Sequence, residues 1–321
     1  MGLMEAQRFP TDYQAVIAGA PVYSLLVQTS SVVKNRLFTT PETALPPATL
    51  ARVNAAALAA CDGKDGLKDG IVTDPRACDW DPIELQCKAA ASADCLTAAQ
   101  VAALRNAYAT LKTSSGKTAK PALNRGGELG WPTFISTQPA RPTAEGQING
   151  LNGFIYGDPN YDTARFDPVT ETDKVRSSPF AKEYEAADPD IRPFLAAGGK
   201  LLLWHGFDDP GPSPLSTIEY YERVKAVTGA ASPVSLFVAP ALYHCGGGPG
   251  ANQIDWLSAL ERWEATGAAP QAIPAARADS PMTRPVCAWP ALPYFKGEGD
   301  PNDARNFACR ETRPVKTASA R

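Results

Sequence analysis

The stretch that decides the fold is Lys-Leu-Leu-Leu-Trp-His-Gly-Phe-Asp-Asp, residues 200–209. Its first six residues form a short apolar run, which is typical of a strand buried on both faces of a parallel sheet. A second such run, Val-Ser-Leu-Phe-Val-Ala, occupies residues 234–239. Between the two runs, Pro214 stands at the first position of a predicted helix that continues to about Thr228. These segments predict a strand-helix-strand unit of a doubly wound α/β fold.

The start of the chain predicts further elements of the same layer. Residues 2–8 have helical character, and residues 13–20 form an apolar run that ends at Gly and Pro, as a buried parallel strand does. Another helix is expected at about 253–266. We therefore assign residues 1–22 and 191–321 to an α/β core.

The region from 23 to 190 has a different texture. It does not alternate strand and helix, and it continues through Gly/Pro-rich segments with scattered aromatic residues. An inserted lid domain over residues 23–190 explains this pattern better than one continuous domain. Its predicted helices lie at 24–37, 48–60 and 98–112, the last of them capped by Thr97.

The composition is ordinary for a soluble globular protein. Apolar residues make up 44% and charged residues 20% of the chain, and the formal net charge is −3. Binding to nucleic acid or to an anionic membrane needs a basic face, so we expect neither. No apolar stretch approaches the roughly 20 residues that cross a bilayer. No protein partner is predicted.

The chain contains only two histidines, His205 and His244. His244 lies in Tyr-His-Cys-Gly-Gly-Gly-Pro-Gly, residues 243–250, shortly after the second apolar run. Catalytic groups of α/β proteins lie on loops beyond the carboxyl ends of parallel strands. The glycines let the backbone turn sharply there. A lone histidine is more often structural, but this position favours a general base.

A general base of this kind needs a carboxylate that orients the imidazole and stabilises its cation. Asp208 and Asp209 both follow the first apolar run, and the residues alone do not separate them. The alternative for either is a solvated turn carboxylate beside Pro210. A carboxylate followed by a histidine is the chain order of an α/β-hydrolase, but no Gly-x-Ser-x-Gly elbow occurs in the 321 residues.

An acidic loop, Asp-Gly-Lys-Asp-Gly-Leu-Lys-Asp-Gly-Ile, occupies residues 62–71. Three carboxylates at this spacing can surround one hard cation, with backbone carbonyls as further ligands, and calcium is the natural occupant. The alternative is a polar surface turn. Repulsion among the carboxylates argues against an empty loop.

Six of the seven cysteines fall into local pairs, which leaves Cys245 over. Sequence alone does not fix the connectivity. The alternative is a set of buried free thiols, but loop cysteines beside Gly and Asp are poor core residues. An oxidising compartment is favoured, so we expect a secreted or periplasmic protein. The suggested pairs are Cys61 with Cys78, Cys87 with Cys95, and Cys287 with Cys309.

Together these motifs resemble the tannase and feruloyl esterase family of serine carboxylesterases. The resemblance covers nearly the whole chain and is carried by residues 3–10, 17–21, 61–75, 198–210 and 244–250. It implies an α/β-hydrolase fold with a large inserted lid. The family's His-Gly-x-x-Asp spacing selects Asp209 over Asp208 as the triad acid that partners His244, and it places His205 at the wall of the substrate pocket.

The resemblance also implies a structural calcium ion and the pairing of the cysteines. The family's disulfides match the three local pairs. Cys245 is similar to the first half of a further disulfide, whose partner precedes the catalytic serine and would lie upstream of Met1. The implied calcium ligands are the side chains of Asp62, Asp65 and Asp69 and the carbonyl oxygens of Leu67 and Ile71.

In the family, a Gly-Cys-Ser-x-Gly-Gly segment directly precedes the stretch that begins this sequence. We therefore expect the chain to be the C-terminal part of a larger enzyme, without the serine, one oxyanion donor and the earlier strands of the sheet. The chain by itself is expected to be inactive.

The predicted function is hydrolysis of aromatic-acid esters through a Ser-His-Asp triad. Trp131 and Phe154 are candidates for stacking on the substrate, and a core role for them is equally open. The alternative function is that of a non-catalytic, calcium-stabilised, disulfide-rich binding protein derived from the same fold.

Overall fold

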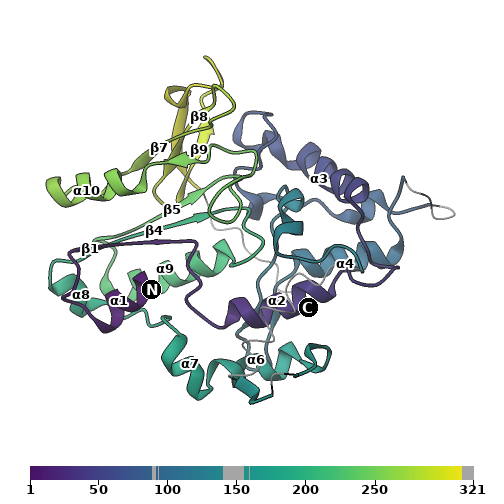
Figure 1. Ribbon diagram of the computed structural model, residues 1–321. Helices are drawn as coiled ribbons and strands as arrows, with labels where there is room; N and C mark the ends of the chain where they lie inside the picture. Colours follow the sequence, from purple (N-terminus) through teal and green to yellow (C-terminus); the bar gives the residue numbers. More distant parts are fainter. Residues whose placement is uncertain (89–91, 93, 140–154, 159, 313–321) are drawn as a thin grey trace.

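The computed structural model describes residues 1–88, 92, 94–139, 155–158 and 160–312 (Figure 1). A three-stranded parallel sheet with the order β1-β4-β5 lies at its centre. The sequence predicted all three strands, because each is mainly apolar. Their bounds are β1 (Ala15–Gly19), β4 (Lys200–Gly206) and β5 (Val234–Ala239).

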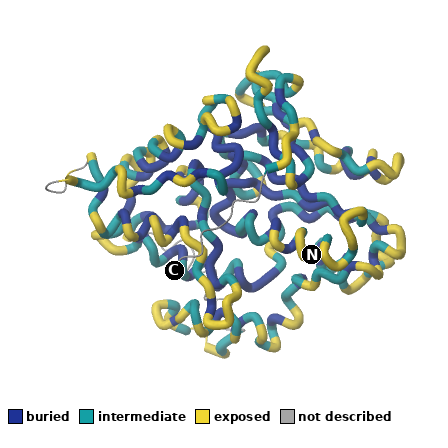
Figure 2. The backbone as a smooth tube through the Cα atoms, turned by 180° about the vertical axis from the view of Figure 1, so that it is seen from behind, coloured by how far each residue is buried: buried dark blue, intermediate teal, exposed yellow. Residues whose placement is uncertain are grey.

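Both faces of this sheet are covered by helices, which is why its strands do not alternate apolar and polar residues. Successive side chains of a strand point to opposite faces. Leu201 and Leu203 therefore pack in one apolar cluster with helices α1, α8 and α9, and Leu202 packs in another with α10. Figure 2 shows buried residues through the middle of the molecule and exposed residues toward its margins. The helices are α1 (Gly2–Arg8), α8 (Arg192–Ala196), α9 (Pro214–Thr228) and α10 (Trp256–Thr266).

The C-terminal part adds antiparallel strands that the sequence did not predict. One sheet has the order β6-β7-β8, and β9 pairs with β10. The expected helix at 253–266 begins later, at Trp256, because the Asp255 side chain caps it and the two residues before belong to a strand. The strands are β6 (Gln253–Ile254), β7 (Ala272–Ala276), β8 (Thr283–Cys287), β9 (Ala291–Phe295) and β10 (Phe307–Glu311).

The segment between β1 and β4, residues 23–190, is called the lid region below. Its described residues form apolar clusters of their own, beside the sheet (Figure 1). The predicted helix at 98–112 ends at Tyr108, because the residues after it pair in a short hairpin. The elements are α2 (Leu26–Arg36), α3 (Pro47–Cys61), α4 (Ala98–Tyr108), α6 (Pro168–Arg176), α7 (Pro179–Tyr184), β2 (Leu111–Lys112) and β3 (Thr118–Lys120).

Short 3-10 turns connect these elements. Those in the lid region are η1 (Asp62–Asp65), η2 (Pro75–Ala77), η3 (Pro82–Leu85), η4 (Glu128–Thr133) and η5 (Thr163–Arg165), and η6 (Ala304–Asn306) precedes β10. Among the helices that the structure describes, none has the length and apolarity needed to cross a membrane.

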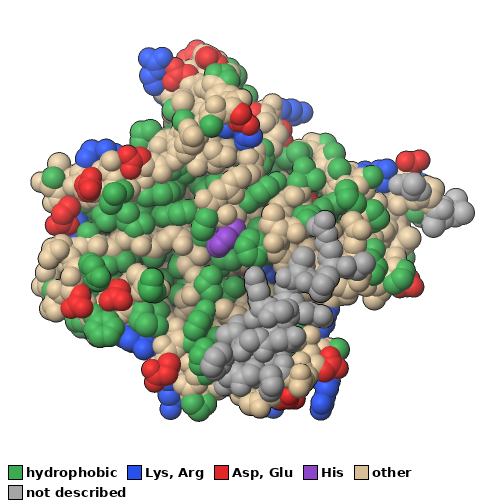
Figure 3. Space-filling view, viewed as in Figure 1, with side chains coloured by type: hydrophobic (Ala, Val, Ile, Leu, Met, Phe, Trp, Pro, Cys, Tyr) green, Lys and Arg blue, Asp and Glu red, His purple; other side chains and the backbone are tan. Residues whose placement is uncertain are grey.

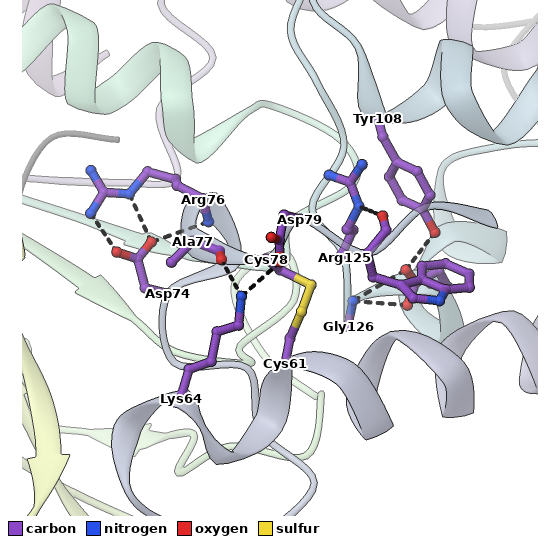
Figure 4. The surroundings of a disulfide bond; sticks show 12 residues. Cys61, Lys64, Asp74, Arg76, Ala77, Cys78, Asp79, Tyr108, Arg125 and Gly126 are labelled. Atoms are coloured by element: carbon purple, nitrogen blue, oxygen red, sulfur yellow. Dashed lines mark hydrogen bonds and ion pairs between the residues drawn. A yellow bond between two sulfur atoms is a disulfide. The ribbon is translucent and has the colours of Figure 1, made fainter. Parts of the chain in front are cut away.

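The three predicted cysteine pairs are confirmed as disulfides, and Cys245 is a free, exposed thiol. The bond between Cys61 and Cys78 joins the last residue of α3 to a residue beyond the acidic loop, so it brackets that loop (Figure 4). The ammonium of Lys64 bridges the same loop, donating to the carbonyl of Ala77 at 2.7 Å and to the carboxylate of Asp79 at 2.8 Å.

Candidate active site

The candidate site lies where β4 and β5 end side by side. His205 is the second-last residue of β4, and the loop after β5 carries His244 back over that strand end. This crossing requires glycine in β4, because a Cβ at Gly206 would lie 2.3 Å from the carbonyl oxygen of Tyr243. Gly248, with φ +84°, closes the same loop against the backbone of Ala241. The glycines therefore bring the two predicted histidine motifs together.

Asp209 and His244 form a hydrogen-bonded pair. The imidazole Nδ1 of His244 donates to Oδ2 of Asp209 at 2.7 Å, and the backbone N–H of Gly211 donates to Oδ1 at 2.8 Å. The Asp209 side chain is fully buried, whereas that of His244 is 28% exposed. Figure 3 shows one histidine at the surface beside apolar side chains, and because His205 has no exposed surface this is His244.

The electrostatics of the pair suit a carboxylate that supports a base. Burial by itself raises the pKa of Asp209, but hydrogen bonds from both histidines outweigh it and hold the pKa below its ordinary value. The hydrogen bond to Asp209 raises the pKa of His244, against the opposing effect of burial. Asp209 is thus ionised, and Nδ1 of His244 carries the proton, which leaves Nε2 to accept one.

His205 lies behind Asp209 and is completely buried. Its Nε2 is 3.0 Å from Oδ2 of Asp209 and 3.2 Å from the carbonyl oxygen of Pro212, and its Nδ1 is 2.8 Å from the hydroxyl of Thr217. We predicted His205 at the wall of the substrate pocket, and in this structure its side chain has no exposed surface. Its ring instead holds the carboxylate from the protein side, because both of its nitrogens face buried partners.

Asp208 is not the partner of His244. Its side chain is buried against the lid region, where a Cβ at Gly127 would lie 2.8 Å from its own Cβ. In the described part of the chain, neither carboxylate oxygen has a hydrogen-bond partner. Burial, followed by the charge of Glu128, raises the pKa of Asp208 well above its ordinary value. Of the two neighbouring carboxylates, only Asp209 contacts the histidines.

Of the two proposed substrate aromatics, the structure describes Trp131. Trp131 is 1% exposed and stacks on Phe38 with ring centroids 5.7 Å apart, so it is a core residue of the lid region. Phe154 lies outside the described residues. The aromatic side chain that does contact the base is Phe134, whose ring stands edge-on to that of His244 at 4.9 Å between centroids. Sequence reasoning missed Phe134, because nothing in its local pattern sets it apart from other lid aromatics.

Cys245 stands next to the free face of the imidazole. Its Sγ lies 3.8 Å from Nε2 of His244, in a residue with φ +56°. Burial raises the pKa of this thiol, so it is the protonated form that stands beside the base at neutral pH.

The acidic loop brings two of its three carboxylates to one cavity. Asp65 and Asp69 both line a cavity that Arg284 also borders. Oδ2 of Asp69 accepts from Arg284 at 2.6 Å, while its Oδ1 is buried and has no hydrogen-bond partner in the described ranges. Burial raises the pKa of both carboxyl groups.

Asp62, the third carboxylate, accepts backbone N–H groups of residues 69, 70 and 71 at 3.2, 2.9 and 3.3 Å and so closes the loop on itself. Within the ranges that the structure describes, no group of three or more His, Cys, Asp or Glu side chains is arranged to hold a metal ion.

Comparison with characterised protein families identifies the chain over most of its length. The family model described as tannase and feruloyl esterase matches residues 1–310. Mono(2-hydroxyethyl) terephthalate hydrolase from Piscinibacter sakaiensis is 32% identical, and a probable feruloyl esterase from Arthroderma benhamiae is 30% identical. Each alignment covers 96% of this chain, and the chain spans 61% of the length of both relatives.

Solved structures show the same fold. An esterase from Aspergillus oryzae superposes with a TM-score of 0.85 at 25% identity, over 96% of this chain and 66% of that one. Tannin acyl hydrolase from Aspergillus niger superposes with a TM-score of 0.74 at 20% identity, over 97% and 62%. The predicted α/β-hydrolase-like fold with a lid insertion is confirmed, as is the predicted family. The chain belongs to the tannase and feruloyl esterase family.

Proposed function

We propose that the protein hydrolyses carboxylic esters of aromatic acids through a Ser-His-Asp triad. Asp209 is the acid, His244 is the base, and the serine comes from a segment outside these 321 residues. The observation that carries the proposal is the 2.7 Å hydrogen bond between Nδ1 of His244 and the buried carboxylate of Asp209, at the carboxyl edge of a parallel sheet. The opposite nitrogen of the same ring, Nε2, is not used by Asp209 and lies 3.8 Å from Sγ of Cys245.

In this mechanism Nε2 of His244 accepts the proton of the serine hydroxyl as its oxygen attacks the ester carbonyl. The imidazolium then protonates the leaving alcohol, and an acyl-enzyme remains. Water repeats the sequence and releases the acid. Asp209 keeps the ring in the tautomer with Nδ1 protonated and stabilises the imidazolium, while His205 and Gly211 hold the Asp209 carboxylate in place.

An aromatic acyl group is favoured by the surroundings of the base and by the relatives. The Phe134 ring lies against His244, and apolar side chains border the exposed imidazole in Figure 3. The two curated relatives are named for a terephthalate monoester and for feruloyl esters, both of which are esters of aromatic acids. We further propose a secreted or periplasmic location, because three disulfides need an oxidising compartment.

A structural calcium ion is proposed for the acidic loop. Asp65 and Asp69 border one cavity, and the buried Oδ1 of Asp69 has no hydrogen-bond partner among the described residues, which suits an oxygen ligand of a hard cation. The side chains of Asp62, Asp65 and Asp69 and the carbonyls of Leu67 and Ile71 would hold the ion. Its contribution would be to join the loop to the C-terminal strands, and no catalytic step involves it.

The test is hydrolysis by the longer protein that carries this sequence. Galloyl, feruloyl and terephthalate monoesters would be compared, and we expect turnover of at least one, which His244→Ala abolishes. A serine-directed fluorophosphonate should label the longer protein and leave the 321-residue chain unlabelled. Labelling of the 321-residue chain that His244→Ala abolishes would contradict an external serine, and correctly folded longer protein without turnover would favour the binding-protein alternative.

A further inference from the structure

We propose that Lys34 is a positioning residue for the triad acid: from helix α2 of the lid region, its ammonium holds the peptide group that orients the Asp209 carboxylate. The inference rests on the proposed function, because it gives Lys34 a part in the same Asp209–His244 pair. Lys34 itself contacts neither the base nor the site of reaction.

Lys34 contacts the loop that follows β4 and carries Asp209, called the Asp209 loop below, through two short hydrogen bonds. Its Nζ donates to the carbonyl oxygen of Pro210 at 2.7 Å and to that of Gly211 at 2.6 Å, and the residue is only 3% exposed. These contacts join positions 176 and 177 residues apart in the sequence. The lid region therefore grips the loop that follows β4 at a buried point.

The two ends of one peptide group connect Lys34 to Asp209. The carbonyl of Pro210 and the N–H of Gly211 belong to the same peptide unit. The carbonyl oxygen accepts from the ammonium, and the N–H donates to Oδ1 of Asp209 at 2.8 Å. A cation on the oxygen polarises the peptide and strengthens its N–H as a donor. The ammonium thus supports the carboxylate through a fixed dipole, without a direct salt bridge.

The charges agree with this connection. Burial lowers the pKa of Lys34 to about 8, and the negative charge of Asp209 opposes that effect. Among the described residues, a second charged group that interacts with Lys34 is Lys120 of β3, whose pKa is lowered by burial and by the charge of Lys34. Asp209 is therefore the anion that compensates this buried ammonium.

The next residue of α2 holds the other side of the site. The side-chain amide of Asn35 donates to the carbonyl of Phe134 at 3.3 Å, and its Oδ1 accepts the backbone N–H of Ser136 at 2.7 Å. Phe134 is the ring that stands against His244. Lys34 and Asn35, adjacent in α2, thus hold the Asp209 loop and the segment that carries Phe134.

Lys120 provides a matched control. It is also a buried lysine that donates to backbone carbonyls, with its shortest bond to Ala109 at 2.6 Å. The carbonyls that it contacts lie at and after the end of α4, and none of them belongs to the Asp209 loop. Lys34→Met and Lys120→Met each remove an ammonium and keep most of the apolar stem. Both substitutions should lower the free energy of unfolding, and only Lys34→Met should weaken the hydrogen bond between His244 and Asp209.

The readout is the proton on Nδ1 of His244, followed by NMR in the 321-residue chain, which has only two histidines. We expect a downfield, slowly exchanging signal in the unsubstituted chain and in Lys120→Met, and its loss in Lys34→Met. In the longer protein, Lys34→Met should lower kcat about tenfold with little change in KM, because such a loss requires only a small error in orientation. Lys120→Met should leave kcat unchanged.

An unchanged His244 signal and kcat in a folded Lys34→Met variant would overturn the inference. If Lys34→Met does not fold, the reciprocal measurement decides. Asp209→Asn should lower the pKa of Lys34, measured by 15N NMR of the side chain. Equal values of the Lys34 pKa with and without Asp209→Asn would overturn the inference as well. The proposed function fails separately, if the unsubstituted chain lacks the His244 signal.

Discussion

The central sheet and the lid region are stabilised by different means. In the sheet, Leu201, Leu202 and Leu203 are fully buried, and apolar helices cover both faces. The lid region buries charged groups instead. Glu128, with no exposed surface, accepts from the hydroxyl of Tyr108 at 2.7 Å and from the amide of Asn54 at 2.8 Å, and burial raises its pKa. The sheet is thus held together by apolar packing, and the lid region places buried polar groups around the Asp209 loop.

This difference shows where precision in the site comes from. The sheet places His205, Asp209 and His244 within reach of one another at its edge. Contacts from the lid region then fix the orientation of Asp209 and His244. Lys34 binds the Asp209 loop, and the Phe134 ring packs against His244. Substitutions in the sheet should therefore act on stability, and substitutions between the two regions should act on chemistry or on the pH dependence of stability.

The largest effect is expected from Asp209→Asn in the longer protein. An amide cannot stabilise the imidazolium and favours the wrong tautomer, so kcat should fall roughly 10⁴-fold. The matched control is the neighbouring Asp208→Asn, which replaces a carboxyl group that burial keeps protonated. It should change kcat by less than about threefold, which corresponds to under about 1 kcal/mol in the activation free energy, because Asp208 does not contact the histidines. Similar losses in both variants would show that the two carboxyl groups are not distinguished as described.

The next effect is on the sheet itself. Leu202→Ala, on the face toward α10, removes a fully buried side chain and should lower the free energy of unfolding by about 3 kcal/mol. Urea unfolding at several pH values checks this, and the loss should be the same at each pH because no titrating group is involved. A loss that varies strongly with pH would contradict a purely apolar role.

Removal of calcium should affect the lid region and its junction with the C-terminal strands. With free calcium at a hundredfold excess over its Kd, binding contributes about 2.7 kcal/mol, so a chelator should lower Tm by several degrees. Asp65→Ala should remove the sensitivity to chelator. Asp79→Ala, at a side chain 93% exposed, should keep it. A Tm that does not respond to chelator in the unsubstituted protein would exclude the site.

The smallest effect is expected from Asp208→Ala, and it depends on pH. The pKa of Asp208 is higher in the folded state than in the unfolded state. Between these two values the folded protein holds a proton that the unfolded chain has lost, so the free energy of unfolding decreases as pH rises. Asp208→Ala removes that decrease and an unpartnered buried carboxyl group, but the cavity that it leaves offsets much of the gain, so the protein should be more stable by about 1 kcal/mol at pH 7.

The gain from Asp208→Ala should shrink toward pH 4, where the unfolded carboxyl group also becomes protonated. Thermal unfolding from pH 4 to pH 8 measures the difference between the two proteins. A constant difference across this range would contradict a protonated Asp208 in the folded state.

The parts of the molecule that were predictable from sequence are those with a local signal. The strands at 200–205 and 234–239 are mainly apolar runs, and the two histidine motifs lie at or after strand ends. The C-terminal strands were missed because Pro274, Pro285 and Pro293 interrupt them, and proline is unusual within paired strands.

Contacts between distant segments leave no local pattern either. The burial of His205 behind Asp209 depends on Thr217, which comes from the next helix. Lys34 reads as an ordinary helix cation until the fold brings it to Pro210. The sequence therefore indicates which residues carry the chemistry, and only the packing of the lid region against the sheet shows which residues orient them.

The central claim, that the Asp209 carboxylate holds the His244 imidazole, is tested most directly by the NMR titration of both histidines in the 321-residue chain, with and without Asp209→Asn. The predicted result is a His244 pKa above its ordinary value, about 6.5, which falls to that value or below it in Asp209→Asn. An identical His244 pKa in the two proteins would contradict the pairing on which the proposed esterase activity depends.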